Sequence, residues 1–133
     1  MAYSNTVTVT RIGANMVKAV ITETDAAQAS EPSAIQMDNR YLSLHRMICS
    51  LTAGTGTTVN PVIGSVTDPG GAGNEAFVQA EASAAADPIN QAWTGGLRCE
   101  ADSALKFYHR SRVNNAAADH TIRTEYWFTI GWR

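Results

Sequence analysis

Histidine is the side chain in this sequence best suited to acid–base chemistry or to metal binding. The three histidines are His45, His109 and His120, and no two of them are two or four residues apart. No pair therefore has the spacing of a local metal-binding motif. We expect partly exposed strand residues whose ring nitrogens are hydrogen-bonded. A catalytic or metal cluster that the fold assembles from separate segments stays open as the alternative.

The two cysteines, Cys49 and Cys99, both fall inside expected strands. Neither has a second cysteine or a histidine at the spacing of a zinc site. We interpret them as buried thiols that act as small hydrophobic side chains. A disulfide between neighbouring strands is the alternative, because an even number of cysteines permits one.

Motifs for nucleophilic catalysis, phosphate binding and calcium binding are missing from the sequence. No serine lies in a G-x-S-x-G turn, and no D-x-D-x-D-G loop is present. The glycine-rich segments GTGTT and GGAG lack the lysine of a phosphate-binding loop and are expected to be turns. The carboxylates are scattered, and no pair is placed for acid–base work. We therefore expect a protein that is not an enzyme, with no catalytic residue, no bound cofactor and no metal.

Basic and aromatic residues are interleaved in KFYHRSR, residues 106–112. In a strand, Lys106, Tyr108 and the arginines share one face, and Phe107 and His109 share the other. We expect the first face to meet solvent or a partner and the second to be buried. The alternative is a platform for a sugar or a single nucleic-acid strand, formed by Tyr108 with Trp93 and Trp127.

The segment VNNAAADHT follows this strand and is expected to be a turn. Asn114 and Asn115 suit left-handed or Asx-turn geometry, and Asp119 can cap the turn before the next strand. Loops that join rigid strands often carry binding surfaces. We therefore predict a partner contact at Asn114, Asn115, Asp119 and His120, with a purely structural turn as the alternative.

The last residues, HTIRTEYWFTIGWR (120–133), alternate almost regularly between apolar and polar side chains. Successive side chains of a strand point to opposite faces. One face is then a nearly continuous apolar stripe made by Ile122, Thr124, Tyr126, Phe128, Ile130 and Trp132. The other face is polar apart from Trp127. This pattern predicts a buried strand that closes a β-domain.

Further strands are expected at 5–13, 16–24, 34–37, 40–54, 61–68, 97–100 and 105–113. The second of these should bury Val17, Ala19 and Ile21. In 40–54, Leu42, Leu44 and Ile48 share one face, and Tyr41, Met47, Cys49 and Leu51 share the other. Because both faces carry apolar groups, we expect this strand to be central and covered on both sides.

Residues 75–86 are open between strand or irregular structure and a short helix. Their alanines favour a helix, but apolar and polar side chains also alternate along them. Short strands separated by Gly, Asn, Asp and Pro turns predict an all-β fold. We expect a single antiparallel β-sandwich domain over residues 1–133, jelly-roll-like, with at most one short helix.

Composition excludes several classes of function. The chain has 133 residues and a formal net charge of −2, and it lacks the basic stripe that sequence-independent nucleic-acid binding requires. No apolar run approaches the roughly 20 residues of a membrane-spanning helix. The first residues, MAYSNTVTVT, lack the pattern of a secretory signal. We expect neither a nucleic-acid partner nor a membrane.

The block GGLRCEADSALKFYHRSRVNNAAADHTIRTEYWFTIGW, residues 95–132, resembles the C-terminal part of small β-rich virion structural proteins of tailed bacteriophages. The Ala- and Gly-rich loops earlier in the chain are similar in style. The resemblance has no diagnostic motif, so it transfers no functional residues. It implies a capsid decoration (cement) protein or another small virion component that assembles without a cofactor.

The expected partner is accordingly the major capsid protein or another virion protein, and the expected location is the virion, assembled in the host cytoplasm. We also expect a homo-oligomer, a trimer or a dimer, because exposed apolar strand faces need cover. The alternative is a carbohydrate- or receptor-binding module of a phage tail or fibre, which would need aromatic side chains on an exposed face.

Overall fold

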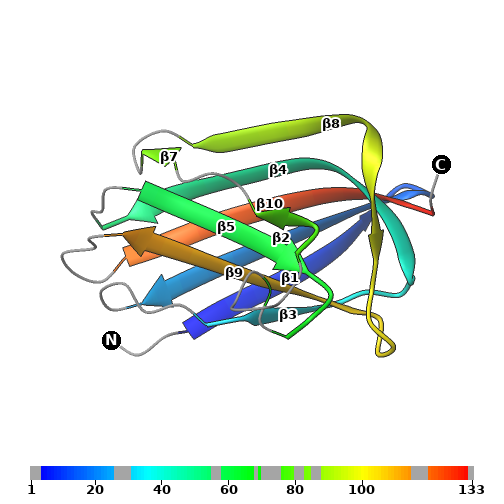
Figure 1. Cartoon of the computed structure of the whole chain (residues 1–133), viewed down its shortest axis with the longest axis horizontal. Coiled ribbons are helices and arrows are strands. Elements are labelled where there is room, and N and C mark those ends of the chain that lie inside the picture. Colours follow the sequence, from blue (N-terminus) through cyan, green and yellow to red (C-terminus); the bar gives the residue numbers. More distant parts are fainter. Residues whose placement is uncertain are drawn as a thin grey trace.

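The computed structural model describes residues 4–25, 31–54, 58–67, 69, 76–79, 83–84, 88–114 and 120–131. Within these ranges all the regular elements are β-strands (Figure 1). They are β1 (Ser4–Ile12), β2 (Met16–Asp25), β3 (Ser33–Gln36), β4 (Tyr41–Ala53), β5 (Thr58–Gly64), β6 (Val78–Gln79), β7 (Ser83–Ala84), β8 (Ile89–Glu100), β9 (Lys106–Asn114) and β10 (His120–Ile130).

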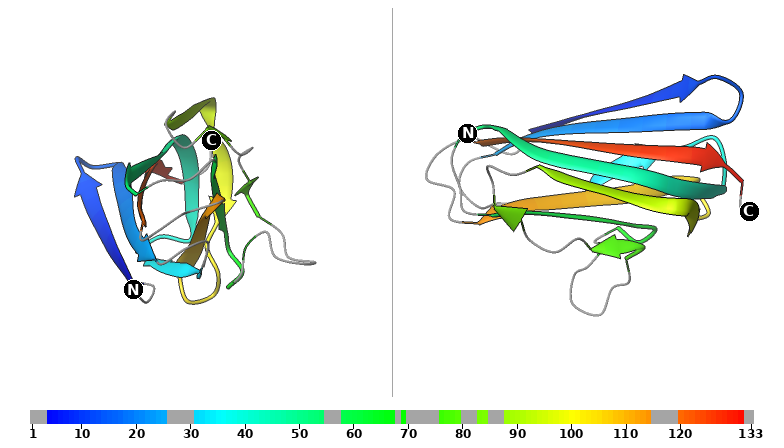
Figure 2. Two further views of the ribbon diagram at one scale, coloured as in Figure 1. Left: turned by 90° about the vertical axis from the view of Figure 1, so that its left-hand side faces the viewer. Right: turned by 90° about the horizontal axis from the view of Figure 1, so that it is seen from above.

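The strands form two antiparallel sheets packed face to face (Figure 2). Sheet A has the order β1-β2-β10-β4-β8, and sheet B has the order β3-β9-β5-β6 with β7 beside β5. The chain passes from β2 to β3, β4 and β5 by changing sheet each time, and it does so again from β8 to β9 and β10. Without β1, sheet A has four strands, and in sheet B the short strands β6 and β7 share the fourth position, beside β5. Two sheets of four positions joined in this way have a jelly-roll arrangement. The expected all-β sandwich is confirmed, and β1 is an additional strand at the margin of sheet A.

The core forms where the apolar faces of the two sheets meet. In β10 the residues Ile122, Tyr126 and Phe128 are buried, as their alternation predicts, while Ile130 is only partly buried. Val17, Ala19 and Ile21 of β2 are buried beside them. Phe107 of β9 lies between the sheets, with its ring centroid 5.5 Å from that of Phe128. Burial of such side chains supplies the main stabilisation of the sandwich.

The prediction that β4 is covered on both faces is wrong, and a β-bulge is the reason. His45 is skipped in the pairing of β4 with both neighbours, since Arg46 pairs with Trp127 and Leu44 with Phe128. One extra residue shifts the alternation of a strand by one position. Leu42 and Leu44 before the bulge and Met47 and Cys49 after it therefore face the same core. Tyr41 and Arg46 are exposed and Ile48 is half-buried.

Strand β8 begins at Ile89, although only its last four residues, from Leu97, were expected from the sequence. Before Leu97 only Ile89 and Trp93 are half-buried apolar residues, and residues 90–92 are exposed, because β8 is the edge of sheet A. Opposite the bulge at His45, residues 93–96 of β8 leave the ladder. The short strands β6 and β7 lie within the ambiguous segment 75–86, so strand or irregular structure is confirmed there for the described residues.

The turn between β8 and β9 carries the chain from one sheet to the other. Asp102 Oδ1 accepts hydrogen bonds from the backbone N–H groups of Ala104 and Lys106, both at 2.9 Å. Its Oδ2 accepts one from the hydroxyl of Tyr108 at 2.9 Å. These bonds, the one from Lys106 above all, hold the pKa of Asp102 below its ordinary value. Leu105 adopts a left-handed conformation with φ of 62° to complete the turn.

The backbone conformation and close surroundings of Gly96 lead to the first testable prediction. Its φ is +84°, and a Cβ atom would lie 2.8 Å from Cβ of Ser43 and 3.0 Å from Cε1 of His45. Gly95 has a similar φ of +80° but open space at its Cβ position. We expect Gly95→Ala to lower the free energy of unfolding by about 1 kcal/mol, through backbone strain alone. Gly96→Ala should lower it by about 2 kcal/mol or more, because it adds a clash.

Urea unfolding of the two alanine variants and the unchanged protein measures both losses. Equal losses at Gly95 and Gly96 would contradict the close approach of β8 to β4.

Candidate functional site

The three histidines lie in separate parts of the fold. His45 sits at the bulge of β4, half-buried, with Nε2 2.7 Å from Oγ1 of Thr129. His109 and His120 are only 0% and 2% exposed. The expectation of partly exposed rings is therefore wrong for these two. Nδ1 of His120 is buried without a hydrogen-bond partner, so its nitrogens are not fully satisfied either.

His109 belongs to a buried polar cluster between the two sheets. Its Nε2 lies 2.7 Å from Oε1 of Glu23, and its Nδ1 lies 2.6 Å from the hydroxyl of Tyr126. Ser111 Oγ donates to the same Glu23 oxygen at 2.6 Å. Glu23 and Tyr126 come from sheet A, whereas His109 and Ser111 come from β9 of sheet B.

Serine, histidine and a carboxylate are the side chains of a hydrolytic triad, but their connections differ here. In a triad the serine hydroxyl bonds to the imidazole, whereas Ser111 bonds to the carboxyl group of Glu23. Each member is at most 3% exposed, and burial raises the pKa of Tyr126 well above its ordinary value. The hydrogen bonds of this arrangement connect sheet A to sheet B.

This polar cluster was not predicted from the sequence, although the sequence contains a signal for it. Glu23 continues the buried alternation of Val17, Ala19 and Ile21 along β2. A carboxyl group in phase with core residues must have a buried partner. His109 has the same parity as Phe107 on the expected strand 105–113, which makes it a natural candidate.

Removing one hydroxyl from this cluster should destabilise the protein. We expect Tyr126→Phe to lower the free energy of unfolding by about 1–3 kcal/mol, because Nδ1 of His109 loses its partner in a site without solvent. Tyr41→Phe removes the same atom from a residue that is 43% exposed, and should cost less than about 0.5 kcal/mol. Urea denaturation of both variants makes the comparison. Similar losses at the two tyrosines would mean that the buried bond contributes no more than a surface one.

Both cysteines are buried, and neither forms a disulfide. Cys99 pairs with Leu42, whereas Cys49 lies seven residues further along β4 and pairs with Ile89. That offset of roughly 20 Å along the strand is far beyond the reach of a disulfide. The interpretation as buried thiols is confirmed. Burial raises the pKa of Cys49 to about 11 and that of Cys99 to about 12.

These raised pKa values predict inert thiols in the folded state. A thiol reacts as the thiolate, so at mildly alkaline pH neither Cys49 nor Cys99 should react with dithionitrobenzoate. After denaturation both should react at once. Absorbance titration counts the reactive groups in each state. A thiol that titrates rapidly in the folded protein would contradict its burial.

The predicted partner contact falls at one end of the sandwich and is only partly covered by the structure. Asn114 is the last residue of β9, and Asn115 and Asp119 lie outside the described residues. His120 opens β10 and its side chain is buried, so a contact there would involve backbone. The four-residue contact stays a prediction.

A groove of about 510 Å³ lies on the outer face of sheet A. It is lined by Met16, His45, Arg46, Ile48, Ala92, Trp93, Thr94, Gly95 and Trp127. These residues come from β2, β10, β4 and β8, which are four neighbouring strands of sheet A. The bulge at His45 and the excursion of residues 93–96 lie opposite each other in the pairing of β4 with β8. The two irregularities therefore shape this groove.

Two tryptophans give the groove its chemical character. Nζ of Lys18 lies 5.1 Å from the ring centroid of Trp127, a cation–π contact. Nε1 of Trp127 is buried and has no hydrogen-bond partner. Of the three aromatic residues considered for a sugar platform, Trp93 and Trp127 share the groove, whereas Tyr108 lies on sheet B and bonds to Asp102.

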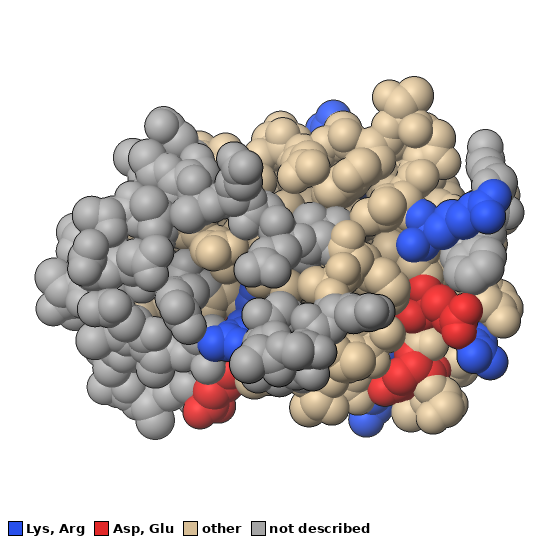
Figure 3. Space-filling view, in the orientation of Figure 1, with Lys and Arg blue, Asp and Glu red and all other residues tan. Residues whose placement is uncertain are grey.

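Charged residues of both signs are mixed on the opposite side of the molecule, which Figure 3 shows. They gather mainly toward the end where β8 connects to β9 (Figure 3), and Arg40 and Glu100 form an ion pair there at 2.8 Å. Among the described residues no three His, Cys, Asp or Glu side chains are grouped to hold a metal ion. The same part of the chain contains no helix long and apolar enough to cross a membrane.

No protein-family model matches this chain, and neither a curated protein nor a solved structure matches it.

Proposed function

We propose that this chain is a non-enzymatic structural protein of a tailed-bacteriophage virion that decorates the head by binding the capsid lattice. The resemblance of residues 95–132 to virion proteins supports the choice of lattice. The proposal also includes self-association of the chain and the major capsid protein as partner.

The observation that carries the proposal is the groove on sheet A. Its lining is apolar and aromatic, with Trp93, Trp127, Met16 and Ile48, and Arg46 stands exposed at its margin. Tryptophan and arginine are the side chains that dominate binding energy at protein interfaces. Because four hydrogen-bonded strands supply the lining, the surface is held rigid before a partner arrives. Pre-organisation of this kind lowers the entropic cost of association.

The distribution of reactive side chains favours a binding role over a catalytic one. The described residues that are best able to move a proton, His109, Glu23 and Tyr126, are enclosed between the sheets and bonded to each other. As the described residues are placed, none of these three side chains is more than 2% exposed. His45, the histidine that does reach the groove, is held by Thr129.

A carbohydrate-binding role is the second candidate, and the same groove supports it. Sugar sites combine a flat aromatic surface with a few polar groups, and Trp93 and Trp127 share this groove with Thr94 and His45. In this case the chain would be a module of a tail or fibre.

The decisive experiment adds the purified protein to undecorated capsids of the phage that encodes it, followed by imaging of the particles. We expect ordered density at symmetry-related positions of the lattice. The double variant Trp93→Ala/Arg46→Ala should bind capsids at least about tenfold more weakly, because it removes two groups typical of interface hot spots.

The matched control is Arg123→Ala. Arg123 lies on the same outer face of β10 and pairs with Ser50 of β4, away from the groove. The variant loses the ion pair of Arg123, whose side chain is 43% exposed, with Glu125. It should bind capsids like the unchanged protein, because neither residue lines the groove. Circular dichroism checks that each variant is folded. Absence of capsid binding, together with groove-dependent binding to a host surface glycan, would replace decoration with the carbohydrate-binding role.

A further inference from the structure

Strand β1 lies outside the jelly-roll arrangement that β2 to β10 form. Nine residue pairs, from Ser4↔Thr24 to Ile12↔Met16, join it to β2, and no described element lies on its other side (Figure 2). Every residue of β1 is exposed except Val7, which is half-buried. A long strand with one unpaired edge presents a row of free N–H and C=O groups to any other strand.

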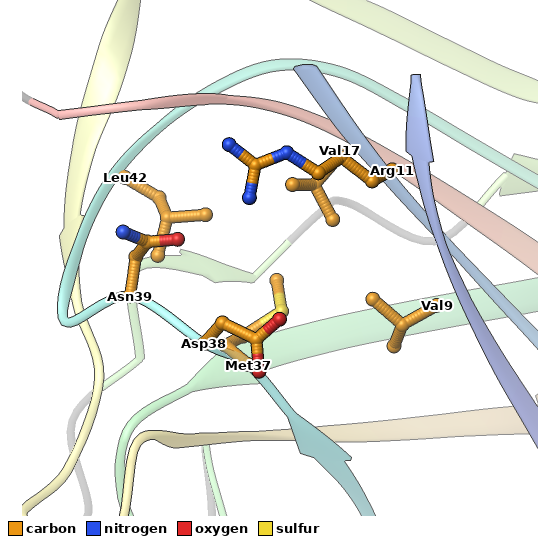
Figure 4. Close-up of a pocket in the computed structure, with 7 residues that line it drawn as sticks. All are labelled: Val9, Arg11, Val17, Met37, Asp38, Asn39 and Leu42. Atoms are coloured by element: carbon orange, nitrogen blue, oxygen red, sulfur yellow. The ribbon is translucent and has the colours of Figure 1, made fainter. Parts of the chain in front are cut away.

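Sheet B covers the inward side of β1 only in part: Asn5 donates a hydrogen bond to Ser33 of β3 at 2.6 Å and Val7 packs against the core, but the cover stops short of Val9. Val9 points inward with Val7, yet it is 39% exposed. Beside it is a cleft of about 120 Å³ between β1, the start of β2 and residues 37–39 (Figure 4). Figure 4 shows Val9 on one side of the cleft and Met37 and Asp38 on the other. Sheet A therefore extends past the cover that sheet B provides.

The usual protections of a sheet edge are missing from β1. Proteins blunt such edges with short strands, bulges, prolines or charged side chains. Strands β3 and β6 have only four and two residues, and β8 carries the excursion at residues 93–96. By contrast, β1 has nine residues, SNTVTVTRI, with one charge. That charge, Arg11, is turned back onto its own hairpin, where Nη2 donates to the carbonyl of Ala14 at 2.9 Å.

The sequence of β1 is symmetric about Thr8, since Thr6-Val7-Thr8-Val9-Thr10 has the same order in both directions. Two identical antiparallel strands related by a two-fold axis place each residue opposite its mirror position in the sequence. We propose that β1 pairs antiparallel with β1 of a second copy about a two-fold axis at Thr8, so that two sheets A join into one continuous sheet.

This register matches like with like on both faces. Val7 meets Val9 of the second copy on the inward face, which covers the valine that the monomer leaves exposed. Thr6 meets Thr10 and Thr8 meets Thr8 on the outward face, and Thr–Thr pairs are favourable neighbours across strands. A two-fold axis at Val9 would instead set Val7 against Arg11, and an axis at Val7 would set Val9 against Asn5. The axis at Thr8 alone keeps the valines together.

The inference specifies the self-association that the proposed function includes, and it does not depend on capsid binding. A dimer through β1 leaves the groove on the central strands of sheet A free, so capsid binding and self-association fail or succeed separately.

Disulfide trapping tests the register directly. Thr8→Cys should form a covalent dimer under mild oxidation, because residue 8 faces itself across the axis within disulfide range. Thr6→Cys and Thr10→Cys should each stay monomeric on a non-reducing gel, since each lies about 13 Å along the strand from its own counterpart. Mixing these two single variants should produce the cross-linked dimer. Cys49 and Cys99 are buried and add no background.

A charge-pairing experiment tests the same axis in solution. Thr8→Lys alone and Thr8→Glu alone should each weaken self-association at least about tenfold, because like charges face each other at the axis. An equal mixture of the two should restore the dimer. Thr52→Lys, at an exposed threonine on β4, should leave it unchanged. Light scattering across a dilution series measures the mass.

Three outcomes would overturn the proposal. The first is an unchanged protein that stays monomeric throughout the dilution series and gives no cross-link at residue 8. The second is an oligomer that Thr8→Lys leaves intact. The third is a monomer whose binding to capsids is lost in Thr8→Lys, which would assign the edge of β1 to a strand of another protein.

Discussion

The carboxyl group of Glu23, buried between two sheets, is the constraint on which the relative placement of those sheets depends. A buried acid without partners costs several kcal/mol, so the fold must bring His109 and Ser111 of β9 to within hydrogen-bonding distance of it. His109 then needs an acceptor or donor at its second nitrogen, and Tyr126 provides it. Neighbouring strands of sheet A and the central strand of sheet B are thus joined by directional bonds. Apolar packing alone would allow several registers, but a slip by one residue would turn Glu23 outward.

The bulge at His45 has an equally wide effect, because it decides which half of β4 faces the core. Without the extra residue, Leu42 and Leu44 would point inward while Met47 and Cys49 pointed out. With it, all four are buried, and Arg46 is placed outward beside Trp127. The neighbouring strand accommodates the bulge through Gly95 and Gly96, whose φ angles of 80° and 84° are accessible to glycine at little cost. Bulges often re-aim side chains at binding sites, and here the groove is built on one.

The sequence predicts those parts of the fold in which a single period runs through a whole strand. β2 and β10 alternate without interruption, so their buried faces follow from parity alone. The bulge in β4 leaves no local signal, because Leu44, His45 and Arg46 look like any half-buried stretch. The earlier part of β8 was missed because an edge strand need not carry an apolar face. The sequence offered Trp93 and Trp127 together only as an alternative, with Tyr108, and could not establish that they share a face. Trp93 and Trp127 are far apart in the sequence, and only the order β10-β4-β8 brings them to one face.

Sheet A offers two kinds of surface whose physical demands differ, and this difference bears on how such a chain would work in a lattice. The groove presents side chains, so its partner is selected by shape and by the few polar groups at the margin. The edge of β1 presents backbone, which binds any extended strand and gains selectivity only from the residues beside it. A surface of the first kind suits recognition of a different protein or a glycan. A surface of the second kind suits a copy of itself, since a strand that is symmetric about Thr8 is complementary to its own reverse. Because the two surfaces lie on different strands of the same rigid sheet, occupation of one leaves the other open. Each copy in a pair would then present its own groove, and two weak attachments to a repeating lattice would reinforce one another through their high effective concentration.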